Sequence, residues 1–397
     1  MNAINVVHML TRFLYGGAER RVADAIAALP EPEYAHTLVV GGESRLEIAR
    51  AAVPTAEVLV VRHLRRSPHP VRDARALTSL VRLLRGRRVD VLHTCHAKAG
   101  VLGRAAGRIT GVPVVMHSIS AADFGPGFGR LASVVYRTAE RAAARWTDAY
   151  FVAGSDLRSR FLDAGIGRPE QYRIVRAPMD VAALAQAREL PREVARRRLG
   201  LDSRRPLVGY VGRLEAVKGV LDLPDYLVAL RASGTPARLV IAGEGELRPS
   251  LEALFAQRGL AEDVVFTGYT PRVSELLRAV DCVVLPSCAE GLPQVLVQAA
   301  AVGTPFVAYE VDGARELLDR GATGSVVEQG AVEEAARASG SWIERHTVGP
   351  LFDLREWHVA ITRACYRSMV EEFADVVTAT RDLHALQEAP AHEAGKG

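Results

Sequence analysis

Lysine is scarce in this sequence, and long apolar runs are missing. Three of the 50 basic residues are lysines, namely Lys98, Lys218 and Lys396, so the position of each lysine is informative. The compact ammonium group of lysine and the planar guanidinium of arginine do different chemistry. No run of about 18 apolar residues without charges occurs, which predicts no transmembrane helix. No basic stretch leads into an apolar segment at the N-terminus, which predicts no secretory signal.

Cysteines are also few, and the net charge is small. The four cysteines are scattered and fit no metal-ligand spacing, which favours reduced thiols in a cytoplasmic protein without a metal site. The net charge of +4, from 50 basic and 46 acidic residues, is too small to indicate nucleic-acid binding.

The basic charge is unevenly distributed along the chain. Residues 62–88 carry nine arginines and a single acid, Asp73. One interpretation is a solvated helix face, and the other is a surface that contacts an anionic membrane or an anionic acceptor. The second interpretation predicts a cytoplasmic protein with a peripheral contact at the inner face of the membrane.

The alternation of apolar runs with helix-like segments predicts the fold. Unbroken valine-rich runs are typical of parallel sheets that are covered on both faces. Two series of runs predict two doubly wound α/β domains, with a cleft and its ligands at the carboxyl ends of the strands. The runs are residues 4–10, 36–42, 56–64, 89–95, 112–119 and 148–155 in the first series, and 206–214, 237–245, 263–270, 281–287 and 305–311 in the second.

A polar stretch with three prolines, residues 175–206, lies between the two series and marks the domain boundary. We therefore predict an N-terminal domain over residues 1–185 and a C-terminal domain over residues 186–362. The amphipathic pattern of residues 354–377 predicts a long helix with no strand after it, which returns to the first domain. We assign residues 363–397 to this helix and to a disordered tail.

The loop "VGRLEAVKG", residues 211–219, follows the first strand of the second domain. It places Arg213 and Lys218 five residues apart across a glycine-containing turn, so both cations can reach one point. Two cations at a strand end suit a diphosphate, whose charge rises as a leaving group departs. The alternative is a loop with ordinary surface charges.

A second loop follows the strand that ends near residue 286. Glu290 and Gly291 lie in it, and a helix is expected to start about Pro293, because proline suits the first helical turn. The free N–H groups of that turn can hold a phosphate. A carboxylate there would repel phosphate, so Glu290 more plausibly accepts hydrogen bonds from sugar hydroxyls, with helix capping as the alternative.

Several stretches together resemble the group 1 (family 4) glycosyltransferases of the GT-B fold. They are "GGAER", "VGRLEAVKG", "AGEGELRPSLEAL" and "PSCAEGLPQVLVQAAAVGTPFVA", with support from "HTCHAKAGVLGRAAGRITGVPVV" and "GIGRPEQYRIV". The resemblance covers residues 4–369. It implies two Rossmann-like domains, with a nucleotide-diphosphate sugar held mainly by the second and an acceptor held mainly by the first. It also implies retention of the anomeric configuration, with no bound metal and no permanent cofactor.

The resemblance also implies roles for single residues. Arg213 and Lys218 would bind the donor diphosphate, and Glu290 would bond sugar hydroxyls. The bare backbone of Gly16 and Gly17 would approach the donor phosphates, whereas the alternative is a turn that needs positive φ. The residues that would contact the donor in addition to those three are Gly16, Gly17, Gly212, Gly291, Leu292, Pro293, Val295, Leu296 and Gln298.

Two positions depart from the family pattern. Gln298 stands where many members have a glutamate that bonds ribose; a neutral amide binds there more weakly, by about 1 kcal/mol. Ser120 stands where the family often has a histidine near the donor sugar. His117 lies three residues earlier and points to the other face of its strand, so we interpret it as structural. Ser120 and Asp123, in the following loop, are candidate contacts to sugar or acceptor.

His93, His96 and Lys98 cluster at the end of another strand. Histidines two or three residues apart can bind a metal, but no acid or cysteine is spaced to complete a site. Lys98 is either a residue at a helix start or a contact to sugar or acceptor in the cleft, and the sequence leaves both open.

The predicted reaction is transfer of a hexose or N-acetylhexosamine from a nucleotide-diphosphate sugar, with a UDP-sugar favoured, to an acceptor hydroxyl. It would serve polysaccharide, glycolipid or natural-product biosynthesis, with a lipid-linked saccharide or a soluble small molecule as acceptor. The alternative is a non-catalytic sugar-nucleotide-binding protein on the same fold. A dinucleotide-dependent oxidoreductase is disfavoured, because no G-x-G-x-x-G motif follows the first strand of either domain.

Overall fold

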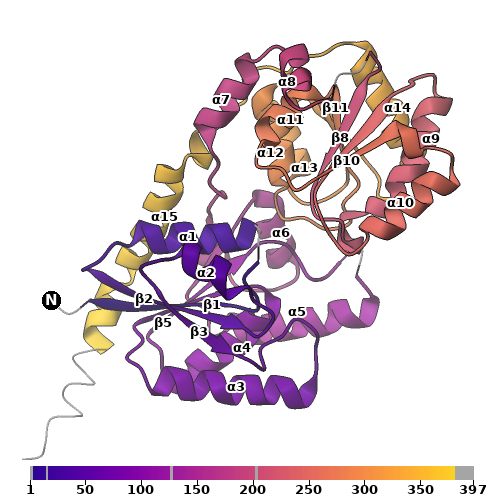
Figure 1. Cartoon of the computed structure of the whole chain (residues 1–397). Helices are drawn as coiled ribbons and strands as arrows, with labels where there is room; N and C mark the ends of the chain where they lie inside the picture. Colours follow the sequence, from indigo (N-terminus) through magenta and orange to yellow (C-terminus); the bar gives the residue numbers. More distant parts are fainter. Residues whose placement is uncertain (1–2, 15–16, 126–127, 202–203, 381–397) are drawn as a thin grey trace, which may run out of the picture.

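The computed structural model describes residues 3–14, 17–125, 128–201 and 204–380 (Figure 1). It contains two parallel sheets, which confirms the expectation of two doubly wound domains. The strand order is β3-β2-β1-β4-β5-β6-β7 in the first sheet and β10-β9-β8-β11-β12-β13 in the second. In both sheets the order reverses beside the first strand, which opens a crevice at the carboxyl ends of the strands.

The first domain alternates strands and helices. Its strands are β1 (Ile4–Leu10), β2 (Tyr34–Gly41), β3 (Glu57–Val61), β4 (Val91–Cys95), β5 (Val114–Ile119), β6 (Ala149–Val152) and β7 (Tyr172–Ile174). Its helices are α1 (Gly17–Ala28), α2 (Leu46–Ala52), α3 (Pro70–Arg85), α4 (Ala97–Thr110), α5 (Arg130–Ala144) and α6 (Ser155–Asp163). Strands β4 and β5 are buried along their whole length, as expected for a parallel sheet with helices on both faces.

The second domain repeats the arrangement. Its strands are β8 (Leu207–Val211), β9 (Arg238–Ala242), β10 (Val264–Gly268), β11 (Cys282–Leu285), β12 (Phe306–Tyr309) and β13 (Gly324–Val327). Its helices are α9 (Leu223–Ala232), α10 (Arg248–Gln257), α11 (Val273–Ala279), α12 (Gln294–Val302), α13 (Ala314–Asp319) and α14 (Val332–Glu344). The edge strands β7 and β13 are three and four residues long, and they were not expected because so short a run carries little apolar signal.

The stretch 175–206 contains two helices, α7 (Val181–Glu189) and α8 (Arg192–Arg198). Both pack against helices of the second domain, α7 on α11 and α12 and α8 on α11. Leu184 of α7 and Ala195 of α8 are buried on the sides of these helices that face the second domain. The many arginines of the stretch hid this apolar side from the sequence analysis. The proposed domain limits themselves stay a prediction.

The helix at the end of the described chain is α15 (Val359–Glu372), and it returns to the first domain as expected (Figure 1). It packs on α1, and Tyr366 and Met369 join the core beneath the first sheet. The Arg367 guanidinium donates to the carbonyl of Ala28 at the end of α1. None of the described helices combines the length and the apolar composition that crossing a bilayer requires.

Ion pairs and backbone contacts join the two domains beside the cleft. Arg160 on α6 makes a bidentate ion pair with Asp312, in which both N–O distances are 2.7 Å. The Arg176 guanidinium lies 2.5 Å from a carboxylate oxygen of Glu316 on α13. The other oxygen of Glu316 accepts hydrogen bonds from Ser155 at the start of α6. These contacts set the distance between the two walls of the cleft.

Candidate functional site

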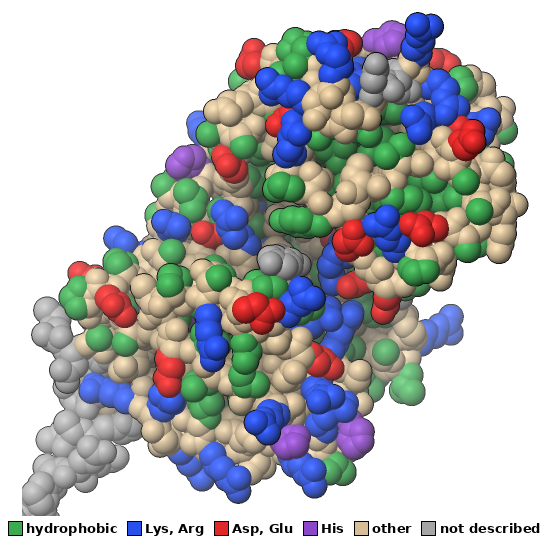
Figure 2. Space-filling view, viewed as in Figure 1, with side chains coloured by type: hydrophobic (Ala, Val, Ile, Leu, Met, Phe, Trp, Pro, Cys, Tyr) green, Lys and Arg blue, Asp and Glu red, His purple; other side chains and the backbone are tan. Residues whose placement is uncertain are grey.

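A cavity of about 720 Å³ lies between the two domains. Its walls are the loops after β1, β4 and β5 of the first domain and after β8 and β11 of the second. These are carboxyl ends of strands, where a doubly wound sheet binds ligands. Figure 2 shows the hollow between the domains, with basic side chains beside it.

Most of the candidate site residues line this one cavity. Gly291, Leu296 and Gln298 are not among the described lining residues, although all three lie in or next to α12. Gly16 lies outside the described residues. The candidates that line the cavity are Gly17, Lys98, Ser120, Asp123, Gly212, Arg213, Lys218, Glu290, Leu292, Pro293 and Val295.

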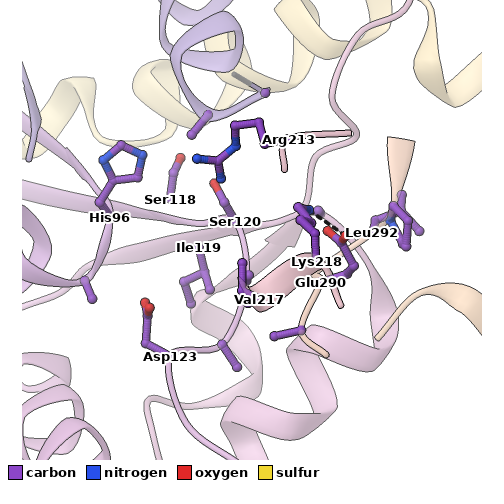
Figure 3. Close-up of a pocket in the computed structure, with 18 of the residues that line it drawn as sticks. His96, Ser118, Ile119, Ser120, Asp123, Arg213, Val217, Lys218, Glu290 and Leu292 are labelled. Atoms are coloured by element: carbon purple, nitrogen blue, oxygen red, sulfur yellow. Dashed lines mark hydrogen bonds and ion pairs between the residues drawn. The ribbon is translucent and has the colours of Figure 1, made fainter. Parts of the chain in front are cut away.

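Lys218 and Glu290 form an ion pair in the wall from the second domain, with Nζ 2.6 Å from Oε1 (Figure 3). Gly219 follows Lys218 with a φ of +62°, and a Cβ on it would lie 1.8 Å from the carbonyl oxygen of Pro286. Only glycine fits this turn, because it is left-handed and meets backbone. The turn therefore fixes the lysine against the loop that carries Glu290.

Arg213 belongs to the same loop but points another way. In Figure 3 its guanidinium extends towards His96 and Ser118, while Lys218 lies against Glu290. Its Nη1 is 2.5 Å from the carboxylate of Glu215. The two cations thus line one cavity, as the spacing suggested, but each faces a different carboxylate.

Helix α12 begins at Gln294, and Pro293 is its N-cap residue rather than its first helical residue. The carbonyl of Pro293 accepts the first helical hydrogen bond, from the amide of Leu296 at 3.0 Å. The amides of Gln294 and Val295 precede any acceptor within the helix. They lie at the positive end of the helix dipole, at the edge of the cavity.

The start of α1 faces the start of α12 across the cleft. A Cβ on Gly17 would lie 2.6 Å from Nε2 of Gln294. The absence of a side chain at Gly17 therefore lets two helix N-termini approach each other. Such a pair of N-termini suits an anion that bridges the two domains.

Gly291 lies where the backbones of the two domains come close together. A Cβ on it would lie 2.1 Å from the carbonyl oxygen of Ser120, which is in the first domain. The Ser120 hydroxyl is buried and has no hydrogen-bond partner among the described residues. Ser120 therefore presents its carbonyl to the second domain, and its Oγ atom is the polar group without a partner.

Asp123 lines the first-domain wall beside Phe124 and Tyr136. Burial, together with the smaller effect of the charge of Glu140, raises the pKa of Asp123 to about 6. A carboxyl with that pKa is partly protonated near neutral pH, so it can donate or accept a hydrogen bond. This suits a contact to a hydroxyl.

Lys98 lies at the start of α4 and is tied to the α3 side of the first domain. Its Nζ is 2.8 Å and 3.0 Å from the two carboxylate oxygens of Asp73, and 2.7 Å from the carbonyl oxygen of Ser67. These three bonds use all the donors of the ammonium group. Lys98 therefore lines the cavity and at the same time braces the loop before α3.

The described cavity wall also contains basic residues that the sequence analysis did not place there, among them Arg12, Arg66 and His96. Burial lowers the pKa of His96 to about 4, helped by the charges of Arg12, Arg213 and Arg66, so its ring is neutral. His96 also has a φ of +67°, which is uncommon for a residue other than glycine. Arg12 lies two residues after β1, and that strand-end position was the signal available in the sequence.

Three buried histidines form a hydrogen-bonded line across the first sheet, which we call the histidine row: His36, His8 and His93. At one end His36 bonds the Leu29 carbonyl at 2.7 Å, and it bonds His8 at 3.2 Å. His8 bonds His93 at 3.0 Å, and His93 bonds the hydroxyl of Ser118 at 2.8 Å. Burial lowers the pKa of each histidine, so the rings are neutral.

The carbonyl at one end of the histidine row determines the direction of every bond. A carbonyl only accepts, so His36 must donate to it and carries its proton on Nε2. The other nitrogen of His36 then accepts from His8, which carries its proton on Nε2. The remaining nitrogen of His8 accepts in turn from His93, which carries its proton on Nδ1. The Ser118 hydroxyl must then donate to Nε2 of His93, and Ser118 is at the same time part of the cavity lining. Among the described residues no group of three or more His, Cys, Asp or Glu side chains could hold a metal ion.

Comparisons with known proteins match both halves of the chain. A model of the family "Glycosyl transferases group 1" matches residues 191–349, and a model of the "Glycosyl transferase 4-like domain" matches residues 16–178. The chain is 33% identical over 276 residues to the alpha-D-kanosaminyltransferase of Streptomyces kanamyceticus, covering 66% of this chain and 71% of that protein.

A second relative is the UDP-Gal:alpha-D-GlcNAc-diphosphoundecaprenol alpha-1,3-galactosyltransferase of Escherichia coli. It is 24% identical over 345 residues, covering 84% of this chain and 87% of that protein. Among solved structures, Anabaena Alr3699/HepE in complex with UDP-glucose superposes with a TM-score of 0.69 at 19% identity, covering 93% of this chain and 100% of that chain. The lipopolysaccharide-biosynthesis protein WaaG superposes with a TM-score of 0.64 at 18% identity, covering 86% of this chain and 94% of that chain. These likenesses establish the fold.

Proposed function

The chain belongs to the group 1 (family 4) glycosyltransferases, and from that premise we propose that it transfers a hexose or N-acetylhexosamine from a UDP-sugar to an acceptor hydroxyl, with retention of configuration. The transfer serves polysaccharide, glycolipid or natural-product biosynthesis. The observation that carries the proposal is the Lys218–Glu290 pair beside the start of α12, facing Gly17 across one cavity. The UDP-glucose complex of the Anabaena protein supports the choice of nucleotide.

The donor diphosphate lies between the starts of α1 and α12 in this proposal. The amides of Gln294 and Val295 donate to its oxygens, and the dipoles of both helices favour its charge. Lys218 has three N–H donors and gives one to Glu290, so two remain for phosphate oxygens. Arg213 supplies the second cation from the same loop.

The sugar lies beside Glu290, whose carboxylate accepts hydrogen bonds from its hydroxyls. Gly291 brings Glu290 against the first domain, so the sugar faces Ser120 and Asp123, which contact sugar or acceptor. Gln298 lies further along α12 and outside the lining of the cavity, so its amide oxygen bonds the ribose only where the donor extends past the cavity along this helix.

In this proposal the protein accelerates the reaction by orienting the donor and the acceptor and by stabilising the negative charge on the departing phosphate. As the bond between the sugar and the diphosphate breaks, negative charge grows on the departing phosphate. Arg213, Lys218 and the α12 amides are already placed to stabilise that charge. The phosphate oxygen then takes the proton of the acceptor hydroxyl, and the acceptor oxygen bonds the sugar carbon on the same face. No metal is required, because the protein's own cations and amides offset the charge.

A donor screen that measures released nucleotide tests the proposal. With the best donor, Arg213→Ala and Lys218→Ala are each expected to lower turnover by orders of magnitude while the protein stays folded. Arg355→Ala is the matched control, because its side chain is 89% exposed and, within the described part of the chain, its ion pair is with nearby Asp353. Near-normal turnover in both site variants would contradict the diphosphate assignment.

The same screen separates the enzyme from a binding protein on this fold. An enzyme releases UDP from the donor by transfer or by slow hydrolysis. A non-catalytic protein would bind the sugar nucleotide, as measured by calorimetry, and release no UDP over hours.

A further inference from the structure

Helix α5 exposes large apolar side chains on one face. Leu131 is 79% exposed, Val135 is 59% exposed and Val134 is 49% exposed. Positions i, i+3 and i+4 lie side by side on a helix, so these three form one continuous surface, which we call the α5 patch. A helix of a globular domain normally turns such a face to the core. A contiguous exposed apolar face of this kind marks an interaction site.

The charges around the α5 patch have one sign. Arg130 and Arg137 lie on the same helix, and Arg145 is the C-cap residue that follows it. The helix has one acidic residue, Glu140, and this carboxylate is turned inward to a buried ion pair with Arg104, with N–O distances of 2.7 Å. The outer face of α5 is therefore apolar and cationic.

The basic surface continues beyond α5. Helices α3, α4 and α5 pack side by side in that order. Arg75, Arg82 and Arg85 of α3 are exposed, and Figure 2 shows basic side chains along the lower edge of the first domain, over α3. This is the arginine-rich segment 62–88, so two separate parts of the sequence supply cations to one end of the domain.

The other side of α5 reaches the cavity. Tyr136, one residue after Val135, lines the cavity and packs into the core beneath the helix. Phe128, just before the helix, also lines it. The α5 patch is therefore one helix diameter away from the first-domain wall of the proposed active site.

We propose that the α5 patch docks on the surface of an anionic bilayer. The apolar side chains enter the boundary between headgroups and acyl chains, and the arginines contact anionic headgroups, which is the pattern of an interfacial helix. The inference rests on the proposed function and deepens it, because docking here brings the first-domain side of the cavity to a lipid surface and so favours the lipid-linked class of acceptor. A second copy of the chain suits the patch less well, because a two-fold contact would set its arginines against each other.

Vesicle flotation tests the docking. The full-length protein is expected to float with vesicles of phosphatidylcholine and phosphatidylglycerol at 7:3 and to stay behind with pure phosphatidylcholine. Raising the salt from 50 mM to 500 mM should weaken binding several-fold, because surface charges are screened. Leu131→Ser/Val135→Ser and Arg130→Gln/Arg137→Gln should each weaken binding at least tenfold. Val228→Ser is the control, because Val228 is 44% exposed on α9 of the other domain and should change nothing.

Two further measurements make each outcome decisive. UDP binding is expected to be the same in the wild type and in the α5 variants, because none of these residues lies in the proposed donor site. Normal UDP binding without flotation on anionic vesicles would overturn the docking and leave the proposed function standing. Failure of the wild type to bind UDP would overturn the proposed function itself. A concentration-dependent dimer that Leu131→Ser/Val135→Ser abolishes would show that a second copy covers the patch, and would also overturn the docking.

Discussion

Replacing Gly291 by alanine is expected to separate catalysis from folding. The new Cβ would lie 2.1 Å from the carbonyl oxygen of Ser120, whereas real Cβ atoms essentially never come within 3.0 Å of another heavy atom. The two backbones must therefore move apart by about 0.9 Å. The partner is a backbone carbonyl in the other domain, so no rotamer change can relieve the clash.

The size of the effect follows from that displacement. Reacting groups are held between the two domains, and a misplacement of about 1 Å costs about 10²-fold in rate. We therefore expect kcat to fall about 100-fold in Gly291→Ala. UDP affinity should change much less, because both proposed cations and the start of α12 belong to the second domain, and only the start of α1 is contributed by the first. The melting temperature should fall by a few degrees at most.

The assay is UDP release with the best donor of the screen, accompanied by calorimetric UDP binding and thermal unfolding. Gly129→Ala is the matched control, because a Cβ there meets no atom within 4 Å. Gly17→Ala is an informative contrast. Its clash, at 2.6 Å, is with the end of the Gln294 side chain, which can rotate away, so a smaller loss is expected there. If Gly291→Ala keeps more than about a third of wild-type kcat, the close approach between the domains is not what positions the reaction.

Three further predictions concern buried polar groups. Burial raises the pKa of Asp123 from 3.8 to about 6. Between these values the native state binds more protons than the unfolded state, so stability falls as the pH rises. Urea unfolding at pH 4.5 and pH 7 should show a loss of about 2 kcal/mol that Asp123→Asn removes. Arg104→Ala should lower the free energy of unfolding by about 3–5 kcal/mol in the same assay, because it leaves Glu140 buried without a partner. The double variant Arg104→Met/Glu140→Leu should recover most of that loss. Equal stability of Arg104→Ala and the double variant would refute this reasoning. Nitrogen-15 shifts of the histidine row should show two rings protonated on Nε2 and one on Nδ1 from pH 6 to 8, and an imidazolium in that range would contradict the neutral row.

Local patterns in the sequence were enough to predict the elements that frame the site. The run 206–214 became β8, and the helix expected to start about Pro293 is α12, which begins one residue later. Valine-rich runs, helical spacing and glycine at turns are properties of a few neighbouring residues, so they can be read before the chain folds. The loops with Arg213, Lys218 and Glu290 follow strands β8 and β11 for the same reason, and they line one cavity.

The tertiary structure alone decided which distant residues meet. The clash expected at Gly291 depends on Ser120, and the histidine row joins β2, β1 and β4 across 28 and 85 residues. Neither contact leaves a local pattern, because strand order and domain orientation bring these residues together. The two helices in the stretch 175–206 were hidden in a similar way. Their large apolar residues are few, and only the neighbouring α11 and α12 reveal which face is buried. Composition and periodicity describe what each segment can become, whereas contacts between segments depend on how the two sheets are wound and set against each other.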